Sequence, residues 1–513
     1  MSGESGDRGP GTRDHGSRSA GILLHPTSLP GPFGIGDLGP WVDRFLDWAA
    51  SAGQTLWQVL PLSPIGGGGA PYGGPSAFAG NPLLISPELL LSDGFLPVSS
   101  FEDLPAFPEE RVDFEAVVRW KERIFRRSWE YFSALLGKPA REELEAFRSA
   151  AAQAGWLSDW TLFSALKARF SGKPWIEWDR DLRERDAGAL ERASGELEAE
   201  VSYQAYLQYL FFRQWERVRI AARERGIAVM GDAPIYVSLD SADVWAHREL
   251  FELDGEGRPT SVSGVPPDFF SETGQLWGNP LYRWDKLEAT GYAWWVARIR
   301  ANLRLCDLLR VDHFRAFAAY WSVPAGEKTA LNGQWLPGPG SKLFDAIRET
   351  LGGELPIVAE DLGMIDEEVK ALLARLGLPG MKVLQFAFYE ADSEYLPHRH
   401  TENSLVYTGT HDNDTARGWY TALKAEERER VFDYLGCDGT DIHWALIRGA
   451  YASVARRAVV PLQDVLGLGS EARMNTPAQP AGNWTWRAPD WAFRAEDAAR
   501  LRRMALLSGR VRV

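Results

Sequence analysis

The sequence predicts a (β/α)8 barrel, an α/β fold of the TIM-barrel type, with large, mainly helical insertions between its strands. Eight short apolar runs are bounded by turn residues, stretches of helical period separate several of them, and acidic residues stand where three of the runs end. Strands buried on both faces of a parallel sheet give continuous apolar runs rather than alternating patterns. The runs lie near residues 20–26, 55–62, 227–237, 307–314, 356–362, 381–388, 404–411 and 457–463.

Two of the stretches between these runs have clear helical features. The segment from Tyr292 to Leu305 carries Trp295, Ile299 and Leu303 at helical spacing, directly before the fourth run. Residues 366–375 begin with acidic side chains, which favour the first turn of a helix. Both segments are therefore predicted to be helices that connect strands of the barrel.

Two long insertions interrupt the alternation of strands and helices. Residues 65–226 exceed what a crossover needs, and they start as a Gly- and Pro-rich loop and continue as helices. Residues 239–292 follow the third run and contain a polar, Pro- and Gly-punctuated stretch at 264–271, which indicates an active-site loop region. Residues 1–19 predict a disordered tail, and residues 20–513 a single catalytic domain.

The composition narrows the class of function. The 513 residues carry a formal net charge of −14, which argues against nucleic acid and anionic membrane surfaces as partners. No apolar run approaches the membrane-spanning length of about 18 residues, and the first 20 residues lack the apolar segment of a signal peptide. The two cysteines, Cys306 and Cys437, are expected to be free thiols in a reducing cytoplasm.

Three acidic residues are the leading candidates for catalysis. Asp312 ends the fourth apolar run, Glu360 the fifth and Asp412 the seventh. Carboxylates at the carboxyl ends of several strands are how a parallel barrel assembles a catalytic site, and two of them suffice to cleave a glycosidic bond. Any one of them alone could equally be a helix cap or an ion-pair partner. All three together, each on its own strand, favour the catalytic interpretation.

Neighbouring residues suggest different ionisation states for the Asp312 and Glu360 carboxyl groups. Arg310 precedes Asp312 by two residues in a strand, so both side chains face the same way and the arginine favours an ionised carboxylate. Glu360 follows an apolar run, and partial burial is expected to raise its pKa and suit it to general acid–base work. His411 precedes Asp412, and a neutral imidazole is a good partner for a hydroxyl group.

Long stretches of the chain, from about residue 20 to the end, match one family. These stretches are Gly21 to Gly39, Trp57 to Pro61, Ser76 to Pro82, Gly231 to Tyr236, Asp240 to His247, Gly264 to Trp284, the three acidic motifs, Pro461 to Gly467, Arg473 to Pro477 and Gly482 to Trp484. Through them the sequence resembles the 4-α-glucanotransferases of the amylomaltase (disproportionating enzyme) family, which are relatives of the α-amylases. Ala70 stands where the family usually has Ser, and residues 66–69 are unusually rich in glycine, so this loop departs from the family pattern.

The resemblance implies a role for each acidic residue and its neighbour. Asp312 is expected to be the nucleophile that forms a covalent glycosyl-enzyme ester, and Glu360 the general acid and base. Asp412 is expected to bind the sugar in subsite −1 and to stabilise the transition state. Arg310 is expected to orient Asp312, and His411 to bond a hydroxyl group of the same sugar.

The resemblance also implies further substrate-binding residues. Tyr72 is expected to stack under the sugar ring in subsite −1, and Asp232 to lie in the site at the end of the third strand. The loop 264–277 is expected to cover the acceptor side of the site, with Asp268 and Trp277 binding the substrate.

The expected activity is transfer of α-1,4-glucan segments to the 4-hydroxyl of an acceptor glucan or glucose, with retention of configuration. Retention needs the Asp312 and Glu360 carboxyls about 5–5.5 Å apart. No cofactor or metal is expected, and the partners are α-1,4-glucans and maltooligosaccharides, with the chain as monomer or homodimer. A retaining α-glucan hydrolase of the amylase type would use the same three acids and stays open. A non-catalytic glucan-binding protein is disfavoured, because binding needs no nucleophile.

Overall fold

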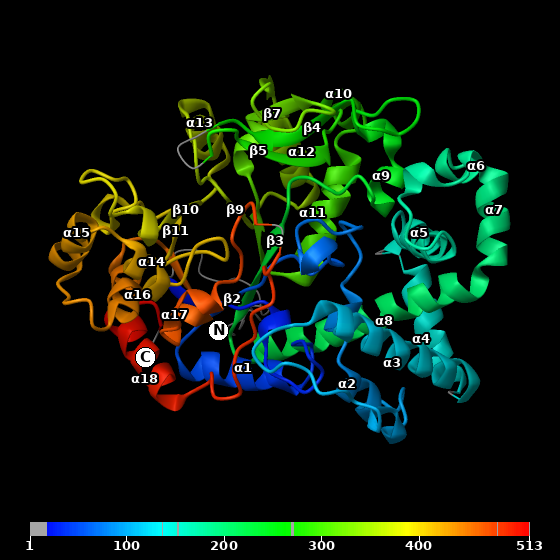
Figure 1. Cartoon of the computed structure of the whole chain (residues 1–513), viewed down its shortest axis with the longest axis horizontal. Coiled ribbons are helices and arrows are strands. Elements are labelled where there is room, and N and C mark those ends of the chain that lie inside the picture. The colour runs from blue at the N-terminus through cyan, green and yellow to red at the C-terminus, as the bar shows by residue number, and fades with distance from the viewer. Residues whose placement is uncertain (1–17, 136, 151–152, 268–270, 480, 512–513) are drawn as a thin grey trace, which may run out of the picture.

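A ring of eight parallel strands forms the centre of the computed structural model, which describes residues 18–135, 137–150, 153–267, 271–479 and 481–511 (Figure 1). The strands follow one another in the order β10-β11-β12-β1-β2-β3-β6-β9. At the remaining gap, the N–H of Ala359, the last residue of β9, donates to the oxygen of Pro379 directly before β10 at 3.0 Å, so the barrel is nearly closed. All eight predicted runs are confirmed as strands: β1 Ser19–Leu23, β2 Leu56–Gln58, β3 Ala228–Ala233, β6 Leu308–Val311, β9 Ile357–Ala359, β10 Gly380–Val383, β11 Ser404–Tyr407 and β12 Arg457–Pro461.

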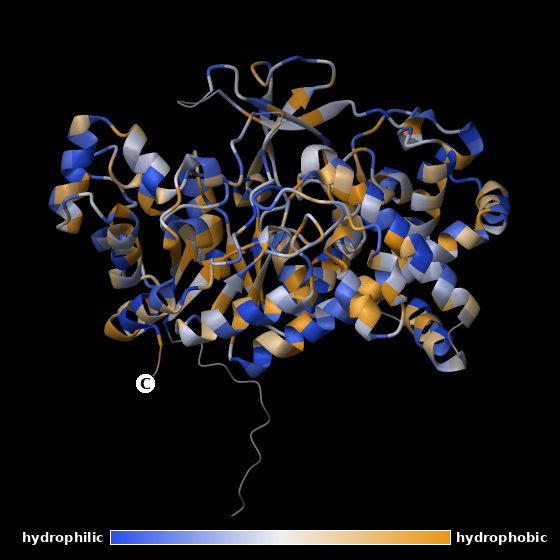
Figure 2. Ribbon diagram, turned by 60° about the horizontal axis from the view of Figure 1, so that its bottom comes forward, coloured by the Kyte–Doolittle hydropathy of each residue, from blue (hydrophilic) through white to orange (hydrophobic). Residues whose placement is uncertain are grey.

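Apolar side chains from nearly every strand fill the inside of the barrel. Because side chains alternate along a strand, every second residue points inward, and the inward positions form one buried layer. Figure 2 shows the resulting concentration of apolar strand residues at the centre of the molecule. The members of this inner cluster are Leu23, Leu56, Met230, Val358, Met381, Val383, Leu405, Tyr407 and Val459.

Helices surround the barrel and connect its strands. The two segments predicted to be helices are α11 and α13. In α13 the Asp366 carboxylate accepts the Val369 N–H at 3.1 Å at the start, and Gly377 ends the helix at a φ of 69°. The helices outside the first insertion are α1 Pro40–Ser51, α9 Ala242–Ala246, α10 Trp284–Ala289, α11 Ala293–Leu305, α12 Ser341–Thr350, α13 Glu367–Leu376, α14 Ala416–Ala422, α15 Ala425–Leu435, α16 Ile442–Ala452, α17 Leu462–Val465 and α18 Ala495–Leu507.

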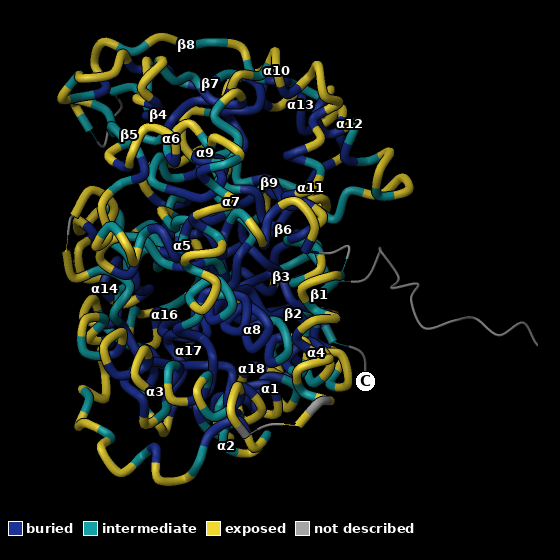
Figure 3. Tube along the Cα trace, turned by 90° about the vertical axis from the view of Figure 1, so that its right-hand side faces the viewer, coloured by how far each residue is buried: buried dark blue, intermediate teal, exposed yellow. Residues whose placement is uncertain are grey.

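The first insertion is helical, and it forms the right-hand side of the molecule in Figure 1. Its helices pack on the long α8, where the Ser128 and Tyr206 hydroxyls are 2.8 Å apart in a buried contact between α3 and α8. Figure 3 shows that α8 is mostly buried while α6 and α7 are largely exposed. The helices are α2 Pro87–Ser92, α3 Phe114–Leu135, α4 Lys138–Ser149, α5 Leu157–Arg169, α6 Arg180–Arg183, α7 Ala187–Glu196 and α8 Glu198–Glu224.

A second, antiparallel sheet stands beside the barrel, and the sequence analysis did not predict it. Its strands run in the order β5-β4-β7-β8. The segment expected to be a loop at 264–277 is instead partly strand, because β4 pairs with both β5 and β7. The sheet appears at the top of Figure 1. Its strands are β4 Ser261–Val265, β5 Gln275–Pro280, β7 Ala319–Pro324 and β8 Gln334–Pro337.

The remaining expectations concern the tail, the cysteines and the membrane. Residues 1–17 of the predicted tail lie outside the described residues, and Ser19 already belongs to β1. Cys306 is buried and Cys437 partly buried, and both are free thiols, as predicted. Within the described part of the chain, every helix is too short or too polar to cross a bilayer.

Gly21 of β1 pairs directly with Leu56 of β2 and has no room for a side chain, so Gly21→Ala is expected to lower the free energy of unfolding by about 1–3 kcal/mol. A Cβ atom at this position would lie 2.5 Å from the Leu56 carbonyl oxygen and 2.7 Å from the Leu56 Cβ. Gly195→Ala is the matched control, because a Cβ there meets nothing within 4 Å and alanine favours the helix α7. Urea unfolding of both variants makes the comparison, and equal midpoints would contradict the expectation.

Candidate active site

The predicted acidic residues lie at one end of the barrel. Asp312 directly follows β6, and Glu360 directly follows β9, its neighbour in the sheet. Asp412 lies in the segment after β11. Because the strands of the barrel are parallel, their carboxyl ends share one edge. The structure therefore places all three side chains at the same mouth.

Arg310 on β6 links two of the carboxylates. Its Nη1 donates to both oxygens of Asp232 on β3 at 2.7 and 2.8 Å, and its Nη2 donates to Asp312 Oδ1 at 2.9 Å. The arginine side chain is only 3% exposed, while that of Asp312 is 29% exposed. Burial alone would lower the pKa of Arg310, but the Asp232 and Asp312 carboxylates raise it well above its ordinary value. A permanent positive charge thus lies beside Asp312, as the sequence predicted.

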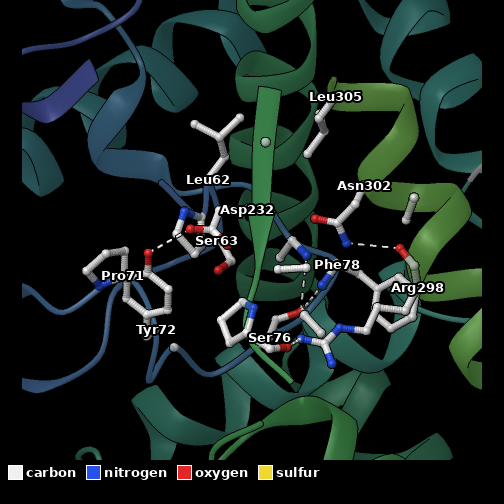
Figure 4. A pocket seen from close by; sticks show the side chains of 18 of the residues that line it. Leu62, Ser63, Pro71, Tyr72, Ser76, Phe78, Asp232, Arg298, Asn302 and Leu305 are labelled. Carbon is white, nitrogen blue, oxygen red and sulfur yellow. Dashed lines mark hydrogen bonds between the residues drawn. The ribbon is translucent and has the colours of Figure 1, made fainter. Parts of the chain in front are cut away.

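Tyr72 closes the network on its other side. Its hydroxyl donates to Asp232 Oδ2 at 2.7 Å, as Figure 4 shows, and lies 2.9 Å from His411 Nε2. Burial and then the Asp232 charge raise the pKa of Tyr72 well above 10, so the phenol keeps its proton. Because that proton goes to Asp232, His411 Nε2 carries the hydrogen in the contact with Tyr72. The Tyr72 and His411 rings are stacked, with centroids 5.2 Å apart.

Glu360 sits in a very different environment from Asp312. Its oxygens accept the backbone N–H groups of His313 at 2.7 Å and Leu362 at 2.8 Å. Burial first, and then the negative charge of Asp312, raise the pKa of Glu360 to about 8, although the charge of Arg310 and the two N–H groups act in the opposite direction. The expected rise in its pKa is confirmed. At neutral pH this carboxyl group therefore holds a proton.

His313 positions one of these donors. Its backbone is left-handed, with a φ of 47°, which is uncommon for a residue other than glycine. The residue directly follows Asp312, and its N–H donates to Glu360 Oε2 at 2.7 Å. Burial lowers the pKa of His313 to about 4, so its ring is neutral. Trp277 of β5 contacts this ring edge-on, with centroids 4.7 Å apart.

Residues from the C-terminal part of the chain donate hydrogen bonds to Asp412. Asn475 Nδ2 donates to its Oδ1 at 2.6 Å, and an Arg473 guanidinium nitrogen donates to its backbone oxygen at 2.6 Å. His411 Nε2 lies 3.4 Å from its Oδ2. The Asp412 side chain is 45% exposed, so it faces the open mouth of the barrel. The sequence analysis gave Asn475 and Arg473 no role, although both lie in a stretch that matched the family.

Most of the predicted site residues therefore belong to one connected group. Tyr72, Asp232, Arg310, Asp312, His411 and Asp412 form a chain of hydrogen bonds and ion contacts, and Glu360 responds to the charge of Asp312. Trp277, 37% exposed, reaches the group through His313. Asp268 lies outside the described residues. A charged carboxylate beside a proton-holding one is the arrangement that acid–base cleavage of an acetal requires.

Comparison with known proteins gives one consistent result. A family model described as 4-alpha-glucanotransferase matches residues 24–492. The 4-alpha-glucanotransferase of Synechocystis sp. is 50% identical over 92% of this chain and 94% of its own length. That of Thermus thermophilus is 49% identical over 95% of this chain and 98% of its own length. The solved structure of an amylomaltase from Streptococcus agalactiae in complex with acarbose has a TM-score of 0.93 at 36% identity, covering 96% of this chain and 100% of that one.

Replacing Asp312 with asparagine is expected to lower the pKa of Glu360, because the variant removes the like charge that disfavours ionisation. A 13C NMR titration of the protein with carboxyl-labelled glutamate measures the pKa of Glu360. The signal that is missing from the Glu360→Gln variant identifies this residue. The wild-type midpoint is expected near pH 8. Asp345→Asn, on the surface of α12, is the control and should leave the midpoint in place. A midpoint that stays near pH 8 in Asp312→Asn would refute the coupling.

Proposed function

The chain belongs to the 4-alpha-glucanotransferase family, and we propose that it works by a retaining double displacement with Asp312 as nucleophile and Glu360 as general acid and base. The observation that carries this assignment is the contrast between the two carboxyl groups. Asp312 receives a hydrogen bond from a buried arginine at 2.9 Å, whereas burial raises the pKa of Glu360 to about 8. A nucleophile has to be ionised and a general acid has to hold a proton.

In the first step, the donor glucan lies across the barrel mouth with its scissile bond between the two carboxyl groups. A carboxylate oxygen of Asp312 forms a bond to the anomeric carbon while the bond from that carbon to the 4-oxygen breaks. Glu360 gives its proton to the 4-oxygen, which becomes the 4-hydroxyl of the departing glucan. The products of the step are a glycosyl ester on Asp312, an ionised Glu360 and a shortened glucan.

In the second step, the 4-hydroxyl of an acceptor takes the place of the departed glucan. Glu360 removes the hydroxyl proton, the oxygen bonds to the anomeric carbon, and the ester bond to Asp312 breaks. Two inversions give net retention, and Glu360 is again protonated. Water in place of the acceptor would give hydrolysis, so the ratio of transfer to hydrolysis depends on the groups that line the acceptor side.

The remaining site residues are proposed to bind the sugar at the cleavage point. Asp412 accepts hydrogen bonds from sugar hydroxyls and stabilises the strained ring, and His411 contacts a neighbouring hydroxyl. Tyr72 presents the face of its ring that is not stacked on His411. Asp232 acts through Arg310 and Tyr72, because both of its oxygens already accept hydrogen bonds from these two groups.

The acceptor side is proposed to involve the antiparallel sheet. Trp277 is partly exposed on β5 and contacts His313 beside the nucleophile, which suits it to stack on an acceptor sugar. Asp268 is proposed to bind the substrate from the same insertion. Maltooligosaccharides and longer α-1,4-glucans of the starch or glycogen type are the proposed substrates, handled in the cytoplasm by a monomer or homodimer. The two unpaired cysteines support a reducing compartment.

With maltotriose as the only substrate, the wild-type protein is expected to produce a ladder of longer and shorter oligomers together with glucose. Asp312→Asn is expected to lower turnover by about 10³-fold or more, since no ester can form, while maltotriose binding stays measurable by calorimetry. Asp345→Asn serves again as the control with unchanged products. Maltose and glucose as the only products would indicate a hydrolase, and an active Asp312→Asn variant would refute the nucleophile.

Glu360→Ala is expected to slow turnover of maltotriose by about 10²–10⁴-fold, because the 4-oxygen then departs without a proton. An α-maltosyl fluoride donor should largely restore formation of the glycosyl ester, since fluoride leaves without protonation. Rapid-quench measurement of fluoride release in the presence and absence of acceptor separates the two steps. Equal losses on both donors would show that Glu360 does not act as the acid.

A further inference from the structure

A large cavity opens at the opposite end of the barrel from the acids. Its volume is about 1280 Å³, and it is lined by the first residues of several barrel strands, including Ser19, Leu56, Ala228, Leu308 and Ile357. The segment near the C-terminus also reaches it, since Arg510 Nη1 donates to Ser19 O at 3.0 Å. The cavity therefore faces the amino ends of the strands, and the packed inner layer of the barrel separates it from the glucan site.

Arginines dominate the charge around this cavity. Five of them line it, against two carboxylates. Asp307 is already engaged by the bidentate Arg219 at 2.7 and 2.9 Å and by the Val229 N–H at 2.8 Å. The second carboxylate belongs to Glu354. The lining thus has a clear excess of positive charge. The five arginines are Arg18, Arg348, Arg456, Arg457 and Arg510.

Arg457 lies at the centre of this arrangement. It is the first residue of β12, two positions before Val459, which belongs to the inner cluster of the barrel. Because side chains two apart in a strand share a face, Arg457 points toward the barrel axis, between its strand neighbours Ser19 and Leu405. Burial lowers the pKa of Arg457, and the adjacent Arg456 lowers it further. Two like charges therefore lie close together in the lining of the cavity.

Four of the five guanidinium groups have no carboxylate bound to them within the described part of the chain, and the fifth, Arg348, lies 3.6 Å from Asp345 Oδ1. Within the described residues, no hydrogen bond or ion pair joins a carboxylate to Arg18, Arg456, Arg457 or Arg510. Arg18 donates to the carbonyls of Tyr451 and Ser453. Arg510 donates only to backbone carbonyls, and burial followed by the charge of Arg18 lowers its pKa to about 9.

We propose that this cavity binds a small molecule that carries one or more phosphate groups, with Arg457 at its floor and Arg456 and Arg18 at its sides. Guanidinium groups match phosphate oxygens in geometry and charge, and a bound anion would supply a counter-charge to the arginines that no described carboxylate contacts. The volume exceeds what a bare inorganic ion fills, so a phosphorylated metabolite is the class of ligand that suits it. The site is separate from the glucan site and from its chemistry.

Calorimetric titration of the full chain with pyrophosphate, at constant ionic strength set with chloride, tests the proposal. Saturable binding of one pyrophosphate per chain is expected. Arg457→Gln should raise the dissociation constant for pyrophosphate about tenfold or more, because a charge-assisted contact is lost. Arg375→Gln is the matched control, because Arg375 is an exposed arginine of α13 whose side chain is 66% exposed and paired with Asp345. It should bind pyrophosphate as the wild type does.

Two further measurements make the outcome decisive. If Arg457→Gln does not fold, the partly buried Arg456→Gln replaces it with the same expectation. The pyrophosphate isotherm should also be unchanged when Asp312→Asn is saturated with maltotriose, since the two sites lie at opposite ends of the barrel. Absence of saturable binding, equal binding by wild type and the arginine variant, or competition by maltotriose would overturn the proposal.

Discussion

The buried ion pair between Arg310 and Asp232 is the interaction on which the rest of the site depends. Taking a guanidinium out of water is costly unless carboxylates surround it, and here Asp232 binds it through both oxygens at 2.7 and 2.8 Å. The pair joins the neighbouring strands β3 and β6. Asp312 then shares the same guanidinium, and Tyr72 bonds the far side of Asp232. Without the pair, Asp312 would lose its bond to the guanidinium and Tyr72 its bond to Asp232.

The same charges give the two carboxyl groups that are proposed to react different environments. Arg310 bonds Asp312 directly, whereas it reaches Glu360 only as a more distant charge. Burial and the charge of Asp312 then act together on Glu360 and raise its pKa to about 8. The proposed nucleophile thus contributes, after burial, to the protonated state that the proposed general acid needs.

The parts of this structure that were predictable are those set by local pattern. The apolar runs at β6 and β9 mark buried strands, and Arg310 two residues before Asp312 fixes their shared face. The sheet of β4, β5, β7 and β8 was not predicted, because β4 pairs with β7 more than fifty residues away and no local pattern encodes that pairing. The contact of Asn475 with Asp412 was not predicted for the same reason, because it joins segments that are distant in sequence. An asparagine in a loop does not by itself indicate a site residue.

His313 connects the antiparallel sheet, which was not predicted, to the residues that are proposed to react. Its N–H donates to Glu360, while its ring lies against Trp277 on β5. An acceptor sugar stacked on Trp277, as proposed, would therefore touch the residue whose N–H binds the proposed acid and base. A displacement of β5 would reach Glu360 through the His313 side chain and one hydrogen bond. Under the proposed mechanism, the insertion that carries Trp277 is thus coupled to the reacting groups, and the choice between sugar and water depends on where it meets the barrel.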